Sequence, residues 1–279
     1  MKDIDIHQAP IGVFDSGVGG LTVVREIMRQ IPQERIVYFG DTARVPYGNK
    51  SKDNIIRYSR QIIRFLRTQN VKAIVVACNT ASACALEEIR PELDLPIIGV
   101  IKPGAKAAAG TTRNGRIGVI GTESTVNSQL YTDFIHDLNP DIRVIGKACP
   151  LFVPLVEEGW LKDPVTEEVA RRYLEDMKQA DVDTLILGCT HYPLLRSTVG
   201  KVMGAQVTLV NPAYETALEL KELLQREGIA AESAPDSTQE AWPEHRFFVS
   251  DLADKFKDFA NSILACEISR IRQIPIENY

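Results

Sequence analysis

Two cysteines stand in matching positions in the two halves of the chain. Cys78 follows the apolar run 73–77, and Cys189 follows the apolar run 184–187. A cysteine side chain exchanges protons readily once its pKa is tuned toward neutrality, and a carbon centre is inverted when a proton removed from one face is replaced from the other. The pair therefore indicates stereoinversion, with one sulfur on each face of the reacting carbon.

The residues behind each cysteine favour a helix that begins close to it. Asn79, Thr80 and Ser82 are good N-terminal capping residues for a helix over 83–89, and a second helix is expected to start near Pro193. Free N–H groups and the dipole at a helix N-terminus stabilise a thiolate. We therefore expect the pKa of Cys78 to fall from about 8.5 toward neutrality.

Other roles for the two cysteines stay open at this point. A free cysteine is often only a small buried hydrophobe. Cys78, Cys189 and His191 could ligate zinc, but their spacing lacks the paired ligands typical of structural zinc sites. Neither cysteine belongs to a C-x-x-C motif, which argues against thiol oxidoreduction. We expect a site without metal or cofactor.

The segments that must position these residues alternate between strand and helix patterns. Short β-branched runs are followed by apolar positions at helical spacing, as in Ile55, Ile62 and Leu66 behind Ser51. The alternation predicts an α/β fold with parallel strands and crossover helices. The predicted strands cover 11–14, 35–39, 73–77, 97–100, 117–120, 144–146, 184–187, 207–210 and 246–249, with a surface loop over 232–244 and a last helix over about 252–264.

The same order of motifs occurs twice along the chain. Residues 117–122 resemble residues 11–16, and residues 186–190 resemble the cysteine-bearing run 75–80. Parallel α/β sheets bind their ligands at the carboxyl ends of the strands. We therefore predict two pseudo-symmetric parallel-sheet α/β domains with the active site in the cleft between them.

Composition excludes several classes of protein. The 279 residues are 44% hydrophobic and 25% charged, as in an ordinary globular protein. A net charge of -5 argues against nucleic acid as a main partner, and the apolar runs are too short to cross a membrane. Five cysteines without a signal-peptide pattern do not form a disulfide framework, so we expect free thiols and a cytoplasmic protein.

Five motifs in order resemble the cofactor-independent aspartate/glutamate racemase family, and in particular its glutamate-specific members. The resemblance covers nearly the whole chain. It rests on Phe14-Asp15-Ser16-Gly17-Val18-Gly19-Gly20-Leu21-Thr22, Gly40-Asp41-Thr42 with Val45-Pro46-Tyr47-Gly48, Ala77-Cys78-Asn79-Thr80-Ala81-Ser82, Pro154-Leu155-Val156-Glu157-Glu158-Gly159 and Leu187-Gly188-Cys189-Thr190-His191-Tyr192-Pro193-Leu194.

The resemblance implies a role for each polar residue in these motifs. Cys78 would handle the α-proton of D-glutamate, and Cys189 would handle that of L-glutamate. Asp15 would assist beside Cys78, while Glu157 and His191 would assist beside Cys189. The substrate contacts that the resemblance implies are Asp15, Ser16, Tyr47, Gly48, Asn79, Thr80, Thr122, Thr190 and His191.

The resemblance also implies how the chain is organised and used. The first domain would comprise residues 1–101 and 212–279, completed by the C-terminal segment, and the second would comprise 102–211. Family members are frequently homodimers. They supply D-glutamate for the peptidoglycan of the bacterial cell wall, which maintains cell shape.

Three rival functions remain open from the sequence. A dinucleotide-binding oxidoreductase is suggested by Gly17-Val18-Gly19 and Asp41, but Thr22 stands at the third glycine position of the fingerprint. A non-catalytic amino-acid-binding module could share the two-domain shape. An aspartate racemase of the same family would differ only in a side-chain pocket, which the sequence cannot size. No sequence motif indicates the dimer interface, an allosteric effector, the reaction rate or the resting protonation of the two cysteines.

Overall fold

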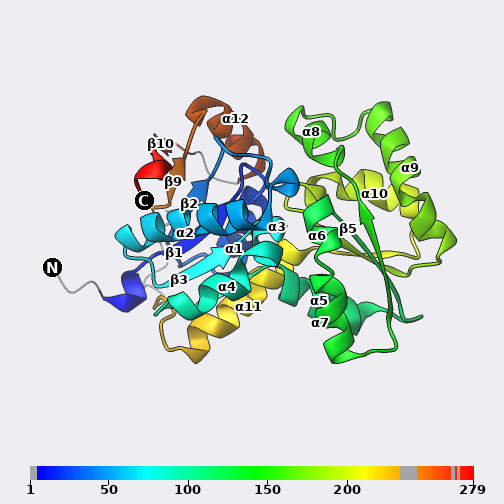
Figure 1. Ribbon diagram of the computed structural model, residues 1–279, viewed down its shortest axis with the longest axis horizontal. Coiled ribbons are helices and arrows are strands. Elements are labelled where there is room, and N and C mark those ends of the chain that lie inside the picture. Colours follow the sequence, from blue (N-terminus) through cyan, green and yellow to red (C-terminus); the bar gives the residue numbers. More distant parts are fainter. Residues whose placement is uncertain (1–4, 233–243, 265–267, 269–270) are drawn as a thin grey trace, which may run out of the picture.

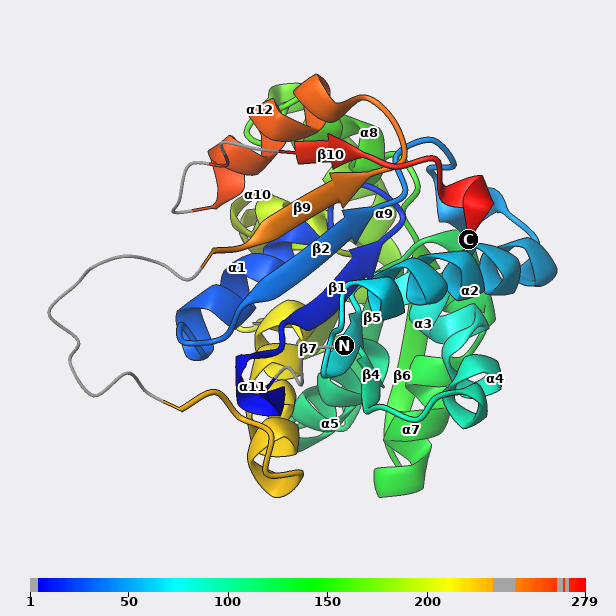
Figure 2. The same cartoon turned by 90° about the vertical axis from the view of Figure 1, so that its left-hand side faces the viewer.

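The strands form two parallel sheets in the computed structural model, which describes residues 5–232, 244–264, 268 and 271–279. The six-stranded sheet has the order β10-β9-β2-β1-β3-β4 and the four-stranded sheet has the order β6-β5-β7-β8. Figure 2 shows β10, β9, β2 and β1 side by side in that order. The strands are β1 Ile11–Asp15, β2 Ile36–Gly40, β3 Ala73–Val76, β4 Ile97–Gly99, β5 Arg116–Gly121, β6 Arg143–Ala148, β7 Thr184–Gly188, β8 Thr208–Val210, β9 Arg246–Val249 and β10 Ile271–Gln273.

The six-stranded sheet and the helices packed on it form what we call the first unit. Successive side chains of a strand point to opposite faces, so Val13 contributes to one core and Phe14 to the other. Helices α1 (Leu21–Gln30), α11 (Pro212–Arg226) and α12 (Ala253–Ile263) cover the first face, and α2 (Lys52–Thr68), α3 (Asn79–Cys84) and α4 (Leu86–Ile89) cover the second.

The four-stranded sheet and its helices form the second unit, which lies beside the first (Figure 1). Helices α8 (Phe152–Glu157), α9 (Pro164–Gln179) and α10 (Arg196–Met203) pack on one face, and α5 (Ile101–Thr111) and α7 (Leu130–Leu138) pack on the other. Helix α6 (Glu123–Asn127) follows β5 and contacts α3 of the first unit. Short 3-10 helices cover Ile6–Gln8, Tyr47–Asn49, Arg90–Glu92, Tyr192–Leu195 and Ile276–Asn278.

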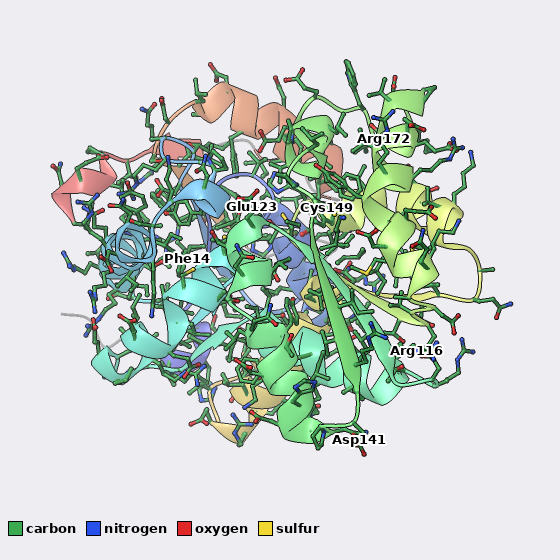
Figure 3. All side chains as sticks on the ribbon, turned by 45° about the vertical axis from the view of Figure 1, so that its right-hand side comes forward. Phe14, Arg116, Glu123, Asp141, Cys149 and Arg172 are labelled. Carbon is green, nitrogen blue, oxygen red and sulfur yellow. The ribbon has the colours of Figure 1, made fainter. Side chains whose placement is uncertain are left out.

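The carboxyl ends of the inner strands lie where the two units meet. Asp15 ends β1 and Cys78 follows β3, whereas Thr122 follows β5 and Cys189 follows β7. Figure 3 shows the polarity of the second sheet: Cys149, just after β6, lies nearer to the first unit than Arg116 at the start of β5. The repeated motifs of the sequence are thus brought to one place by the two sheets.

The predicted fold class is confirmed, and each of the nine predicted strands is present with small shifts at its ends. Strand β10 was not predicted because a three-residue run with two polar side chains carries no alternation signal. The predicted start of the helix behind Cys78 is wrong: α3 begins at Asn79, and Cys78 itself is the N-cap. Of the predicted loop 232–244, residues 233–243 lie outside the described residues. The residue boundaries of the two domains stay a prediction.

No helix in the described part of the chain is long and apolar enough to cross a bilayer.

A buried ion pair fixes the amino ends of the first sheet. Lys72, just before β3, and Glu34, before β2, have side chains that are 0% and 1% exposed, and their Nζ and Oε2 atoms are 2.7 Å apart. Lys72 Nζ also donates to the His7 carbonyl, and Glu34 Oε1 accepts from the N–H of Ala231. The pair therefore joins the N-terminal segment to the segment after α11.

We expect Lys72→Met to lower the free energy of unfolding by about 3 kcal/mol, because it leaves the buried Glu34 carboxylate without its cation. Lys52→Met is the matched control, since the Lys52–Glu88 pair is exposed and contributes little. Denaturant unfolding of both variants measures the difference. Equal stability of the two variants would contradict this account of the pair.

Candidate active site

Cys78 is held at the N-terminus of α3 by contacts within the first unit. Its Sγ accepts a hydrogen bond from the N–H of Ala81 at 3.4 Å and lies 3.7 Å from the Ser16 hydroxyl. Asp15, fully buried at the end of β1, accepts the N–H of Gly17 on Oδ2 at 3.0 Å. Ser16 therefore lies between Cys78, the predicted acid–base residue, and the Asp15 carboxylate.

Burial dominates the acidity of this half of the site. It raises the pKa of Cys78 to about 12, the charge of Asp15 adds to the rise, and the Ala81 N–H offsets it only in part. Burial also raises the pKa of Asp15. The expected fall of the Cys78 pKa toward neutrality is therefore wrong for this arrangement: the helix N-terminus is present, but desolvation of the thiolate outweighs it.

Cys189, His191 and Glu157 form a chain of contacts in the second unit. Cys189 Sγ lies 3.8 Å from His191 Nδ1, and His191 Nε2 lies 3.0 Å from Glu157 Oε1. Burial lowers the pKa of His191, but hydrogen bonds to Cys189 and Glu157 and the nearby negative charges outweigh it and raise the value to about 10. His191 is accordingly an imidazolium at neutral pH, with one N–H for the sulfur and one for the carboxylate.

The two halves meet through Thr190. Its hydroxyl donates to Asp15 Oδ1 at 3.4 Å, and its carbonyl accepts from the Thr22 hydroxyl at 2.9 Å. A Cβ on Gly19 would lie 2.3 Å from Thr190 Oγ1 and 2.5 Å from His191 Nδ1. The glycine-rich turn thus makes room for the second unit, which contradicts its use as a dinucleotide cradle. The charge of Cys189 also raises the pKa of Cys78, so the two sulfurs act on one another.

Hydroxyl groups form a second contact between the units. Thr80 Oγ1 lies 2.9 Å from Thr122 Oγ1, which in turn lies 3.0 Å from Thr125 Oγ1. The Ser124 hydroxyl donates to the Gly48 carbonyl at 2.8 Å, and a Cβ on Gly48 would lie 2.9 Å from Thr122 Cβ. Three of the predicted substrate contacts, Gly48, Thr80 and Thr122, are therefore grouped here.

The hydroxyl of Tyr47 is used inside the first unit. It donates to Asp41 Oδ2, which also accepts from Arg44 Nε at 2.7 Å. Ser250 donates to the other oxygen of Asp41 at 2.9 Å. The Tyr47 side chain therefore anchors the turn, and Gly48 is the part of the turn that reaches the second unit.

Asn79 is bonded across the units by a residue that the motifs did not single out. The Tyr131 hydroxyl donates to Asn79 Oδ1 at 2.8 Å. Tyr131, Thr125, Asp41 and Arg44 were all missed as contributors to the site. Of these four, only Asp41 could have been predicted from the sequence, because it directly follows strand β2, much as Asp15 ends strand β1.

Two small cavities border the candidate site. One of about 10 Å³ is lined by Asn79, Cys189, Thr190 and residues of α1 and α11, which is about the space of one water molecule. Another of about 90 Å³ is lined by Gly17, Val45, Glu157 and Phe256. Glu157 therefore faces the first unit across a gap.

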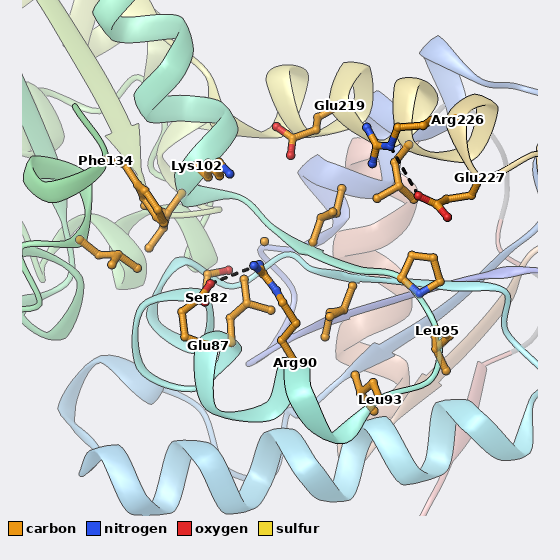
Figure 4. A pocket seen from close by; sticks show the side chains of 18 residues that line it. Ser82, Glu87, Arg90, Leu93, Leu95, Lys102, Phe134, Glu219, Arg226 and Glu227 are labelled. Atoms are coloured by element: carbon orange, nitrogen blue, oxygen red, sulfur yellow. Dashed lines mark ion pairs between the residues drawn. The ribbon is translucent and has the colours of Figure 1, made fainter. Parts of the chain in front are cut away.

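A cavity of about 440 Å³ lies elsewhere, between α4, α5, α7 and α11 (Figure 4). Four of its charged residues form ion pairs, Arg90 with Glu87 and Arg226 with Glu227 (Figure 4). None of the predicted site residues lines it. Among the residues that the structure describes, Cys78, Cys189 and His191 do not form a metal-binding group.

These features define a class of protein: a two-unit α/β enzyme in which each unit brings a cysteine, with polar partners, to a shared site. The family model for Asp/Glu/hydantoin racemases matches residues 11–219. The chain is 49% identical over 267 residues to a glutamate racemase of Geobacter metallireducens, covering 96% of this chain and 97% of the relative.

Solved structures agree with that match. A glutamate racemase isoform from Bacillus anthracis superposes with a TM-score of 0.91 at 41% identity, covering 96% of this chain and 98% of that one. A glutamate racemase from Francisella tularensis, solved in complex with D-glutamate, gives a TM-score of 0.88 at 38% identity, covering 98% and 100%. The chain belongs to the Asp/Glu/hydantoin racemase family, among its glutamate racemases.

We expect Glu157→Gln to lower the pKa of His191, because the variant removes a carboxylate that stabilises the imidazolium. Titration of the imidazole signals by NMR in both proteins measures the change. Glu158→Gln, at the exposed neighbouring position, should leave the titration of His191 as in the wild type. An unchanged His191 titration in Glu157→Gln would contradict the assigned cause.

Proposed function

We propose that the chain is a glutamate racemase that interconverts L-glutamate and D-glutamate by proton transfer to and from Cys78 and Cys189, without a cofactor. The observation that carries the proposal is the facing arrangement of the two cysteines. Each follows an inner strand of its sheet, and the Thr190–Asp15 hydrogen bond ties their surroundings together. The relatives that share this chain over nearly its full length carry the same activity in their names.

The proposed reaction needs one base and one acid on opposite faces of Cα. With D-glutamate, the sulfur of Cys78 as thiolate takes the α-proton while the thiol of Cys189 delivers a proton to the other face, giving L-glutamate. The reverse reaction exchanges the two roles. Each turnover leaves the protonation states of the two sulfurs exchanged, so no net proton is gained or lost.

The charged neighbours support this exchange in different ways. Asp15 is suited to accept the substrate ammonium, whose positive charge would offset the negative charge that raises the pKa of Cys78. On the other side, the His191 imidazolium can donate to the Cys189 sulfur whenever that sulfur is negative, and Glu157 holds the ring from behind. Asp15, Glu157 and His191 thus assist the two cysteines.

The neutral donors suit the two carboxylates of the substrate. Ser16, Asn79, Thr80, Thr122 and Thr190 lie around the cysteines, together with Gly48 and the Tyr47 turn that holds it. Donors directed at the α-carboxylate also stabilise the negative charge that develops when the α-proton leaves. This is the stabilisation that a reaction without a cofactor requires.

We propose a cellular role and an oligomeric state for the enzyme as well. As a member of the family, the enzyme would work in the cytoplasm and supply D-glutamate for peptidoglycan synthesis and cell-wall biogenesis. We also propose that it forms homodimers, which gel filtration with light scattering would test.

The decisive experiment follows purified protein with L-glutamate, and separately with D-glutamate, in D2O. We expect both enantiomers to racemise with deuterium at Cα. Cys78→Ser and Cys189→Ser should each lower the rate by at least about a hundredfold, because a serine hydroxyl is a far weaker acid than a thiol. Polarimetry and NMR measure the two quantities.

Cys149→Ser is the control, since Cys149 is equally buried but donates to the Lys147 carbonyl outside the site, and it should racemise normally. Activity on aspartate but not on glutamate would refute the substrate assignment and keep the two-thiol mechanism. Binding of glutamate without racemisation would support the amino-acid-binding module instead.

A further inference from the structure

The hydrogen bond between Tyr131 and Asn79 crosses from one unit to the other. Tyr131 belongs to α7 of the second unit, and Asn79 is the first residue of α3 in the first unit. Their exposed fractions are 2% and 4%, and Tyr131 Oη lies 2.8 Å from Asn79 Oδ1. The bond therefore exists only when the two units are joined as they are here.

Hydrogen-bond counting fixes the direction of this bond. Within the described residues, Asn79 Oδ1 is the acceptor for the buried Tyr131 hydroxyl, and leaving that hydroxyl hydrogen without an acceptor would be costly. Burial, with the charge of Cys189, raises the pKa of Tyr131. The phenol therefore stays protonated and remains a donor throughout the working range of pH.

The direction of the bond decides which end of the Asn79 amide is free. With Oδ1 engaged, the NH2 group is the end that remains, and it has no hydrogen-bond partner among the described residues. Asn79 also lines the small cavity that Cys189 and Thr190 border. A fixed NH2 donor beside a reacting thiol is suited to an anionic oxygen.

We propose that Tyr131 is a positioning residue that acts through Asn79: it holds the amide so that the NH2 group, and not the carbonyl oxygen, is presented to the α-carboxylate of the substrate. This inference rests on the proposed function. It also makes the orientation of a first-unit residue depend on closure against the second unit. A freely turning amide would present its oxygen for part of the time and repel the carboxylate.

The coupling between the two residues tests the proposal. We expect Tyr131→Phe to lower kcat/KM for glutamate about tenfold, as the loss of one orienting hydrogen bond would. In an Asn79→Ala background the same substitution should change kcat/KM by less than about twofold, because the amide through which Tyr131 acts is gone. Full additivity of the two substitutions would overturn the proposal.

Tyr192→Phe is the matched control for a merely structural effect. Tyr192 is equally buried, and its hydroxyl donates to the Cys149 and Gly121 carbonyls within the second unit. Its effect on kcat/KM, whatever its size, should multiply with that of Asn79→Ala, because within the described part of the chain the Tyr192 hydroxyl bonds to these two carbonyls and not to the amide. Thermal unfolding of each variant separates loss of stability from loss of orientation.

A second variant keeps the proposal falsifiable if Tyr131→Phe folds poorly. Asn79→Asp retains the acceptor for Tyr131 and places a negative oxygen where the NH2 group was, so it should be less active than Asn79→Ala. If the carbonyl oxygen of Asn79 faced the substrate ammonium instead, the aspartate would be the better of the two, and the proposal would fail. Racemisation by the wild type, measured first, separates this failure from failure of the proposed function.

Discussion

The proposed site depends on one constraint: the carboxyl edges of two parallel sheets must face each other closely enough for two sulfurs to reach one carbon atom, as the proposed reaction requires. Parallel strands deliver their carboxyl ends to a single edge, so each sheet brings its cysteine and a polar partner to the same side. The closeness is set by Gly19, where any side chain would collide with Thr190 and His191. The hydrogen bonds from Thr190 to Asp15 and between Thr80 and Thr122 then hold the edges together.

Around the two sulfurs the charges are unequal, although the folds that carry them are similar. Cys78 has an anion as its nearest charged neighbour, and Cys189 has a cation. In a desolvated site this difference is large, because burial leaves little water to screen it. Two similar units therefore place their cysteines beside neighbouring groups of opposite charge.

Much of this arrangement was readable from the sequence, because strands and their ends leave local signals. The apolar runs before Cys78 and Cys189 predict strands, and the capping residue Ser51 predicts the start of a helix, through contacts a few residues apart. The sequence does not predict the order of the strands in each sheet, the hydrogen bond from Tyr131 to Asn79 or the Arg44–Asp41–Tyr47 contact. Each of these depends on segments that only the complete fold brings together. The expected acidity of Cys78 is wrong for the same reason: the helix terminus is a local feature, whereas the burial that raises the pKa of Cys78 arises only in the complete fold.

The strands of the first sheet come from two stretches of the chain that are separated by the whole second sheet, and this has a consequence for how the protein is made. Strands β9 and β10, which extend that sheet beyond β2, are encoded after every strand of the second sheet. During synthesis on the ribosome the second unit can therefore complete its sheet while the first still exposes β2 as an open edge, and an open edge is where strands of other chains attach. Rapid emergence of residues 246–279, which carry β9 and β10, would close that edge. A pause in translation over this stretch, or a truncation within it, would prolong the aggregation-prone interval even though every residue of the chemical site had already been made.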